Sequence, residues 1–241
     1  MMSKPCPPES RTVTARVISL DDVSSDVRVL RLELENKTDL DYHAGQYAYL
    51  TFDNAPTRPY SIANAPGGSM LEFHIKGVGS ATDKGASYHA THNLSLGDSV
   101  KVDAPHGTHI WRAVDRPVLL LAGGVGIAPM KAITEAALHN NSQHPLYLYW
   151  SVRNSAALYL EQDFRKLAAK HAHFHFIPLL SETPDDRLRS GTLAQALETD
   201  FDSLSGYAAF MAGPTGMVEA TAPFLLDKGL EKNFLFCDSF G

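Results

Sequence analysis

Between Arg11 and about Trp111, hydrophobic and polar residues alternate with a period of two. Alternation of this kind is typical of strands with one buried and one solvated face. Clusters of Gly, Pro, Asn and Asp interrupt the pattern and indicate turns between short strands. This half of the chain therefore predicts an antiparallel β-barrel. The alternating segments include Val13-Ala15-Val17, Leu30-Leu32-Leu34 and Leu71-Phe73-Ile75.

After Asp115-Arg116-Pro117 the pattern changes to short apolar runs separated by stretches with helical spacing. Strands that alternate with helices predict a parallel sheet, and five such runs predict an α/β domain with a five-stranded parallel sheet. We therefore expect a tail or linker at 1–10, a barrel at 11–114 and an α/β domain at 115–241. The five runs are Val118–Ala122, Leu146–Trp150, Phe174–Leu180, Tyr207–Met211 and Phe234–Phe236, and the expected helices are Met130–His139, Ala156–His171, Thr192–Leu197 and Thr215–Lys228.

Charge and composition exclude several classes of function. The formal net charge is −6 without a dense basic patch, so we expect no nucleic-acid partner. No run approaches the roughly 18 apolar residues of a membrane span and no signal peptide is visible, so we expect a cytoplasmic protein without a membrane partner. Cys6 and Cys237 are the only cysteines, too few for a cysteine-bound iron–sulfur cluster or zinc site. His171, His173 and His175 lack a further ligand at suitable spacing, and we expect no metal site.

Two segments have the residue types needed to bind a flavin and a dinucleotide. In Arg58-Pro59-Tyr60-Ser61-Ile62, the arginine suits a phosphate, the tyrosine ring suits an isoalloxazine and the serine can donate a hydrogen bond. In Gly123-Gly124-Val125-Gly126-Ile127-Ala128-Pro129, main-chain N–H groups can approach a pyrophosphate where a helix begins. Each pattern is weak alone, but their order and their expected elements strengthen both.

With these segments the chain resembles the ferredoxin–NADP reductase superfamily, in particular NAD(P)H-flavin reductases and the reductase components of bacterial oxygenases. The resemblance implies that Arg58 contacts phosphate, Tyr60 packs on the flavin ring and Ser61 lies near N5. It also implies that Pro59 and Ile62 belong to the flavin site, with Ile62 at the ring edge. The main chain of His74, Ile75 and Lys76 would approach the flavin or its ribityl chain.

Further segments resemble the cofactor-binding positions of the same family. Gly85, Ala86 and Ser87 resemble a Gly-x-x-Ser motif that holds the FAD pyrophosphate. It is one residue short, so FMN and an ordinary helix start stay open alternatives. The Gly123–Pro129 segment matches the nicotinamide-dinucleotide loop. Gly213 and Pro214 would guide the nicotinamide ring. The residue before them is Ala212, where many members of the family have cysteine.

The end of the chain resembles the family's acidic-x-aromatic terminus. Phe240 would shield the flavin face, and Asp238 would lie near the reacting pair or be a plain surface carboxylate. His106-Gly107 would either shape the flavin pocket or form an ordinary turn. Arg153, Arg187 or Arg189 could meet a 2′-phosphate, whereas Glu182 could instead accept from a 2′-hydroxyl, so NADH is only slightly favoured over NADPH.

The resemblance implies an enzyme that passes hydride from NADH or NADPH to FAD. Electrons would then go to a ferredoxin, an oxygenase component or a free flavin. Ser61, Phe240 and Asp238 are the expected catalytic positions. The alternative is a flavin-binding redox sensor with the same fold that signals to a partner instead of turning over.

Overall fold

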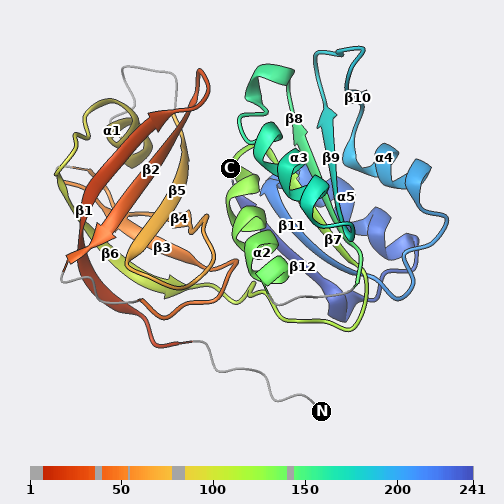
Figure 1. The fold of residues 1–241 in the computed structure, drawn as a ribbon, viewed down its shortest axis with the longest axis horizontal. Helices are drawn as coiled ribbons and strands as arrows, with labels where there is room; N and C mark the ends of the chain where they lie inside the picture. The colour runs from red at the N-terminus through yellow and green to blue at the C-terminus, as the bar shows by residue number, and fades with distance from the viewer. Residues whose placement is uncertain (1–7, 36–39, 54, 78–84, 140–143, 241) are drawn as a thin grey trace. The chain divides into compact units, whose positions relative to one another are not determined.

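The computed structural model describes residues 8–35, 40–53, 55–77, 85–139 and 144–240 (Figure 1). The chain divides into two compact units. The first comprises residues 1–111 together with 131–136, and the second comprises residues 112–130 together with 137–241. Most of the expected tail at 1–10, including Cys6, lies outside the described residues.

The first unit contains a nearly closed antiparallel barrel, as the period-two pattern predicts. Its strands are β1 (Arg11–Asp22), β2 (Val27–Leu34), β3 (Tyr47–Thr51), β4 (Arg58–Ser61), β5 (Met70–Lys76) and β6 (Ser99–His106). They pair in the order β4-β3-β6-β1-β2-β5, and every pairing is antiparallel. The two end strands, β4 and β5, also contact one another, so the sheet almost closes on itself.

The barrel core consists of the alternating apolar side chains. Leu30, Leu32, Leu71 and Phe73 have no exposed surface, and Ile75 has almost none. A short helix, α1 (Ala86–His92), adds Ala86 and Ala90 to the same cluster. These positions confirm that the sequence alternation marks the inner face of the barrel.

The second unit is built around a six-stranded parallel sheet. Its strands are β7 (Val118–Gly123), β8 (Leu146–Val152), β9 (Phe174–Leu180), β10 (Arg189–Ser190), β11 (Ala208–Pro214) and β12 (Leu235–Phe240). Their order is β10-β9-β8-β7-β11-β12, with parallel pairing throughout. The five predicted strands are all present. The sixth, β10, has only two residues, too few to produce a periodic signal.

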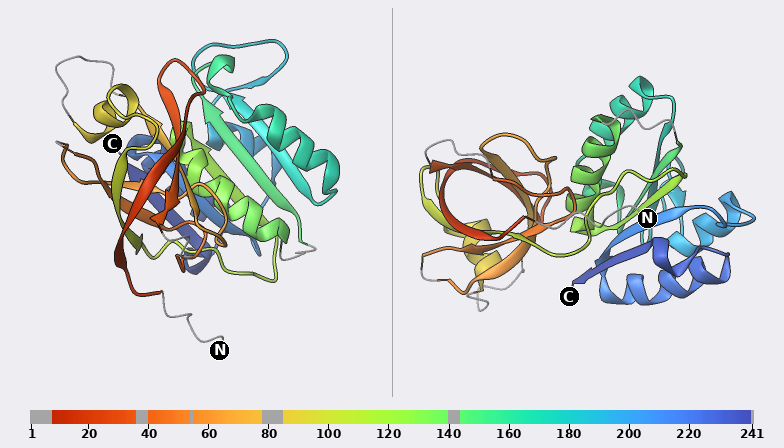
Figure 2. Two further views of the ribbon diagram at one scale, coloured as in Figure 1. Left: turned by 60° about the vertical axis from the view of Figure 1, so that its left-hand side comes forward. Right: turned by 90° about the horizontal axis from the view of Figure 1, so that it is seen from below.

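Helices cover both faces of this sheet (Figure 2). Tyr149 on β8 belongs to the cluster that α4 (Leu193–Asp200) and α5 (Thr215–Asp227) cover. Its neighbour Trp150 points the other way and contacts Phe164 of α3 (Glu161–Lys170). The remaining helices are α2 (Ile127–His139) and the short 3₁₀ segments Gly124–Gly126, Ser155–Ala157 and Lys232–Phe234. Among the described residues, no helix has the length and apolar character that crossing a membrane requires.

Candidate functional site

The predicted flavin motif forms β4, the strand at one end of the barrel order. Its residues pair with β3, which places Ser61 opposite Tyr47 and Arg58 opposite Leu50. Pro59 is tolerated because an end strand does not need every main-chain donor. Arg58 and Pro59 are exposed, so the motif lies at the surface of the first unit.

Tyr60 connects this strand to α1. Its hydroxyl lies 3.0 Å from the Ser87 hydroxyl, and its ring packs beside Phe52. Burial raises the pKa of the Tyr60 phenol, despite the Ser87 hydrogen bond and the nearby Arg58 charge. Tyr60 is therefore a neutral phenol at physiological pH, with a fixed ring beside an exposed cation.

The structure also brings the Gly85–Ser87 segment to this strand. Gly85 precedes α1 and accepts a hydrogen bond from the His89 N–H, and Ser87 reaches Tyr60. The two predicted FAD segments are therefore neighbours within the first unit. Lys84, which precedes them, lies outside the described residues.

Not every predicted flavin contact lies at the surface. The Ile62 side chain is completely buried in the barrel core, so it cannot line a flavin edge. The N–H and C=O of Glu72 bond Asn64 and Ala63, away from β2. Main-chain N–H and C=O groups point to alternate sides along a strand. Those of His74 and Lys76 therefore point away from β2, as those of Glu72 do, whereas those of Ile75 point toward β2.

These residues fit the flavin group that the motif predicts. A half-buried ring, an exposed guanidinium and a hydroxyl follow one another on a single surface strand. An isoalloxazine needs a flat apolar neighbour and a hydrogen-bond donor, and its phosphates need a cation. The chemistry of the donor set therefore suits a flavin nucleotide.

In the second unit, the glycine segment packs directly against the end of β11. A Cβ on Gly126 would overlap the main-chain carbonyl of Ala212, and a Cβ on Gly123 would overlap Met217. Trp150 holds the segment from the other side, since its ring N–H donates to the Gly124 carbonyl at 2.9 Å. Small residues here let the main chain of the two segments approach closely.

Strand pairing aligns the other predicted nucleotide residues with this segment. Ala212 pairs with Ala122 on β7 and with Asp238 on β12. Further along, Gly213 pairs with Ser239, and Pro214 with Phe240. All lie at the carboxyl ends of parallel strands, beside the point where the order changes direction between β7 and β11. Open α/β sheets bind nucleotides at such a switch point.

The three candidate arginines have different surroundings. Arg153 and Glu182 are both exposed and form an ion pair at 3.6 Å, just beyond β8 and β9. Arg187 pairs with Asp185 through two hydrogen bonds, and Arg189 contacts Asp200 and the Ala196 carbonyl. Arg153 and Glu182, the two opposing signals for the 2′ position, are therefore neighbours.

Two residues that support the candidate site could not be recognised from the sequence. Met217 packs against Gly123 and Gly213, and Glu72 is buried on the outward side of β5 among cations. A charged residue in an alternating strand normally indicates solvent, so nothing in the pattern distinguishes Glu72. Among the described residues, no group of three or more His, Cys, Asp or Glu is placed to hold a metal ion.

Comparison with known proteins decides the family. An oxidoreductase FAD-binding domain model matches residues 14–111, and an oxidoreductase NAD-binding domain model matches residues 120–222. The ferredoxin–NAD(P)(+) reductase component of the naphthalene 1,2-dioxygenase system of Pseudomonas putida is 31% identical over 235 residues. That match covers 96% of this chain and 70% of the relative. The chain belongs to the ferredoxin–NADP reductase superfamily.

Other members of the superfamily are similar over most of the chain. The NAD(P)H-flavin reductase of Vibrio harveyi is 29% identical over 244 residues, covering 95% of this chain and 98% of the relative. The crystal structure of the Amycolatopsis cytochrome P450 reductase GcoB superposes with a TM-score of 0.89 at 30% identity, covering 98% and 71% of the two chains. This member is therefore a flavin-dependent oxidoreductase that uses FAD and NAD(P)H. The roles assigned to individual residues stay predictions.

Proposed function

We propose that this reductase takes hydride from NADH or NADPH onto bound FAD and passes the electrons to a separate acceptor. The observation that carries the proposal is the packing of Gly123–Gly126 against Ala212 and Gly213, at the carboxyl ends of β7 and β11. Two nucleotide motifs far apart in sequence meet there, at the position where parallel sheets bind nucleotides. The exposed Arg58–Ser61 strand of the barrel supplies groups suited to the flavin.

FAD, when bound, supplies the hydride-accepting ring, and the nicotinamide cofactor supplies the hydride. The protein's contribution is positioning. Arg58 holds a phosphate, and Tyr60, fixed by Ser87, supports the ring. Ser61 donates a hydrogen bond near N5, whereas Gly213 and Pro214 guide the nicotinamide. Along β12, Asp238 pairs with Ala212 and Phe240 pairs with Pro214, and both act beside the nicotinamide.

The acceptor we propose is a ferredoxin, an oxygenase component or a free flavin. Protein acceptors and free flavins are both represented among the relatives, since one relative serves a naphthalene dioxygenase system and another is a flavin reductase. Steady-state reduction of free FMN, compared with reduction of a plant-type ferredoxin, separates the two. Rapid turnover with FMN alone supports a flavin reductase, and turnover only with the ferredoxin supports a partner protein.

Two substitutions test the flavin site directly. Arg58→Ala removes the proposed phosphate contact, so we expect FAD affinity to fall by about tenfold, as for loss of a charged hydrogen bond. Ser61→Ala should keep FAD bound but slow its reduction by NADH about tenfold or more. The measurements are FAD titration of the apoprotein and stopped-flow bleaching of the flavin band.

Thr57→Ala is the matched control, because the Thr57 hydroxyl shares a hydrogen bond with the Thr51 hydroxyl and lies just before β4. It should bind FAD and be reduced at the wild-type rate. A wild-type protein that binds neither FAD nor FMN at micromolar concentration would refute the proposed function. Unchanged reduction kinetics in Ser61→Ala would remove only the N5 assignment.

A further inference from the structure

The outward side of β5 contains ionisable residues that are nevertheless buried. Leu71, Phe73 and Ile75 point into the barrel core, so Glu72 and His74 point to the opposite side. Their side chains are only 7% and 0% exposed. A carboxylate in such a position is costly unless charged partners surround it.

Glu72 has two charged partners, Lys131 and Arg31, and a third polar partner, the His74 imidazole. One carboxylate oxygen lies 3.1 Å from His74 Nε2 and 3.1 Å from Lys131 Nζ, and the other accepts from Arg31 Nε at 2.7 Å. Burial alone would raise the pKa of the Glu72 carboxyl. The hydrogen bond from His74 and the charges of Lys131 and Arg31 outweigh burial, and they hold that pKa far below its usual range. Glu72 is therefore an anion whose position is defined from three sides.

Lys131 connects Glu72 to the chain segment that follows β4. It belongs to the part of α2 that is grouped with the first unit, and its ammonium donates to the Ala63 carbonyl at 3.2 Å. It also pairs at 2.7 Å with Glu135, whose other oxygen accepts from the Ala65 N–H at 2.9 Å. The main chain on either side of Asn64 is thus held by two α2 residues.

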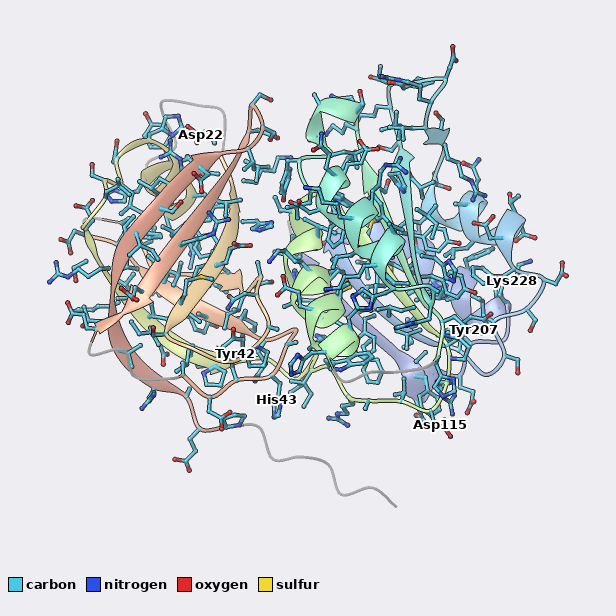
Figure 3. The ribbon with its side chains drawn as sticks, viewed as in Figure 1. Asp22, Tyr42, His43, Asp115, Tyr207 and Lys228 are labelled. Carbon is cyan, nitrogen blue, oxygen red and sulfur yellow. The ribbon has the colours of Figure 1, made fainter. Side chains whose placement is uncertain are left out.

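Asn64 and Tyr42 complete the attachment. The Asn64 side chain accepts from the Glu72 N–H at 2.9 Å and donates to the Met70 carbonyl at 3.0 Å. The hydroxyl of Tyr42, labelled in Figure 3, lies 3.1 Å from the Asn64 carbonyl and 2.9 Å from the Ala65 carbonyl. The segment Ala63–Ala65 therefore has polar contacts at every residue, and it begins two residues after Ser61.

Stability alone does not account for a cluster of this kind. Replacing a buried ion pair by apolar residues of similar volume is often neutral or stabilising, so its presence is better explained by the geometry it defines. We propose that Glu72 is a positioning residue for the flavin strand: its carboxylate orients Lys131 and His74, and Lys131 holds the main chain that follows Ser61. This inference rests on the proposed function, because it takes β4 as the flavin-binding strand.

Glu72→Gln tests the inference, because it keeps the shape and removes the charge. We expect the variant to fold, to bind FAD about tenfold more weakly, as for a lost charged hydrogen bond, and to have a more positive flavin midpoint potential. The potential should rise because the variant loses the negative charge of Glu72, whereas Lys131 and Arg31 keep their positive charges and their contacts with Glu135 and Asp21. Glu198→Gln is the control, since Glu198 of α4 forms an ion pair with Lys228 at 2.8 Å but is exposed and lies in the second unit. It should leave FAD affinity and potential unchanged.

The double variant Glu72→Gln/Lys131→Met separates positioning from charge balance and serves if the single variant does not fold. Removing one charge of each sign should return the midpoint potential toward the wild-type value. FAD affinity should stay low, because the Ala63 carbonyl has lost its donor. Wild-type affinity in either folded variant would overturn the inference. Wild-type protein that binds no flavin would instead refute the proposed function, so the two failures are distinguishable.

Discussion

At Gly126 there is no space for a side chain. A Cβ at this position would overlap the main-chain carbonyl of Ala212 and lie 3.0 Å from the Gly213 nitrogen. Both neighbours are main-chain atoms of a buried strand, so they cannot rotate away as a side chain could. We expect Gly126→Ala to lower the free energy of unfolding by about 3 kcal/mol, the upper part of the range for overpacking. Denaturant titration measures this change, and NADH affinity should fall with it.

Gly216 supplies the matched control for this substitution. It lies in α5, and a Cβ there would have no atom within 4 Å. Gly216→Ala should therefore be neutral or raise the unfolding free energy by up to about 1 kcal/mol, the helix preference of alanine over glycine. Equal stabilities for the two variants would show that the β7 and β11 ends are not packed as described.

Residue chemistry predicted some of the site but not its supports. Tyr60, Ser61 and the glycine segment could be recognised because their residue types match the groups they would bind. Ile62 belonged to the same motif, yet its side chain is in the core, because the alternation of β4 continues past its end. The burial of Glu72 depends on Lys131, far along the chain, and no local pattern contains that information.

Among the helices, α4 has the best-defined start. Thr192 accepts from the Gln195 N–H at 3.2 Å, and the Gln195 side chain accepts from the Thr192 N–H at 2.9 Å. Removing such a cap costs about 1 kcal/mol. Thr192→Ala should reduce the unfolding free energy by that amount without changing NADH oxidation, because α4 contains none of the proposed site residues. Chemical denaturation and a steady-state assay measure the two quantities.

Thr192→Ser retains the capping hydroxyl, so it should behave like the wild type in both measurements. If Thr192→Ala and Thr192→Ser lost the same stability, the cause would be side-chain packing and not the cap. A loss of activity in Thr192→Ala alone would place α4 nearer the chemistry than its residues indicate.

For helices and strands, the sequence predicted the type of each element better than the order of the strands in each sheet. Period-two alternation identified β1, β2 and β5 of the barrel, and apolar runs identified five of the six parallel strands, because each lies next to a continuous core. The barrel order β4-β3-β6-β1-β2-β5 depends on pairing between distant segments, which periodicity does not encode. The two-residue β10 is defined only by its partner β9.

The stability of the whole protein should depend on pH through His74. Its imidazole has no exposed surface, and burial lowers its pKa, with the charges of Lys131 and Arg31 adding to the effect against the opposing Glu72 hydrogen bond. In the unfolded chain the same imidazole is solvated and titrates at the ordinary histidine pKa of about 6.5. Below that pH the unfolded state binds a proton that the folded state does not, so acidification favours unfolding.

We therefore expect the free energy of unfolding to fall between about pH 7 and pH 5, by at most about 1.4 kcal/mol per pH unit from this one group. His74→Gln should make the dependence shallower by up to one proton, because glutamine can still donate to Glu72 without titrating. Denaturant titrations across this pH range give the slopes directly. A slope in His74→Gln as steep as that of the wild type would mean that the acid sensitivity comes from elsewhere, and that the buried imidazole accepts a proton in the folded state.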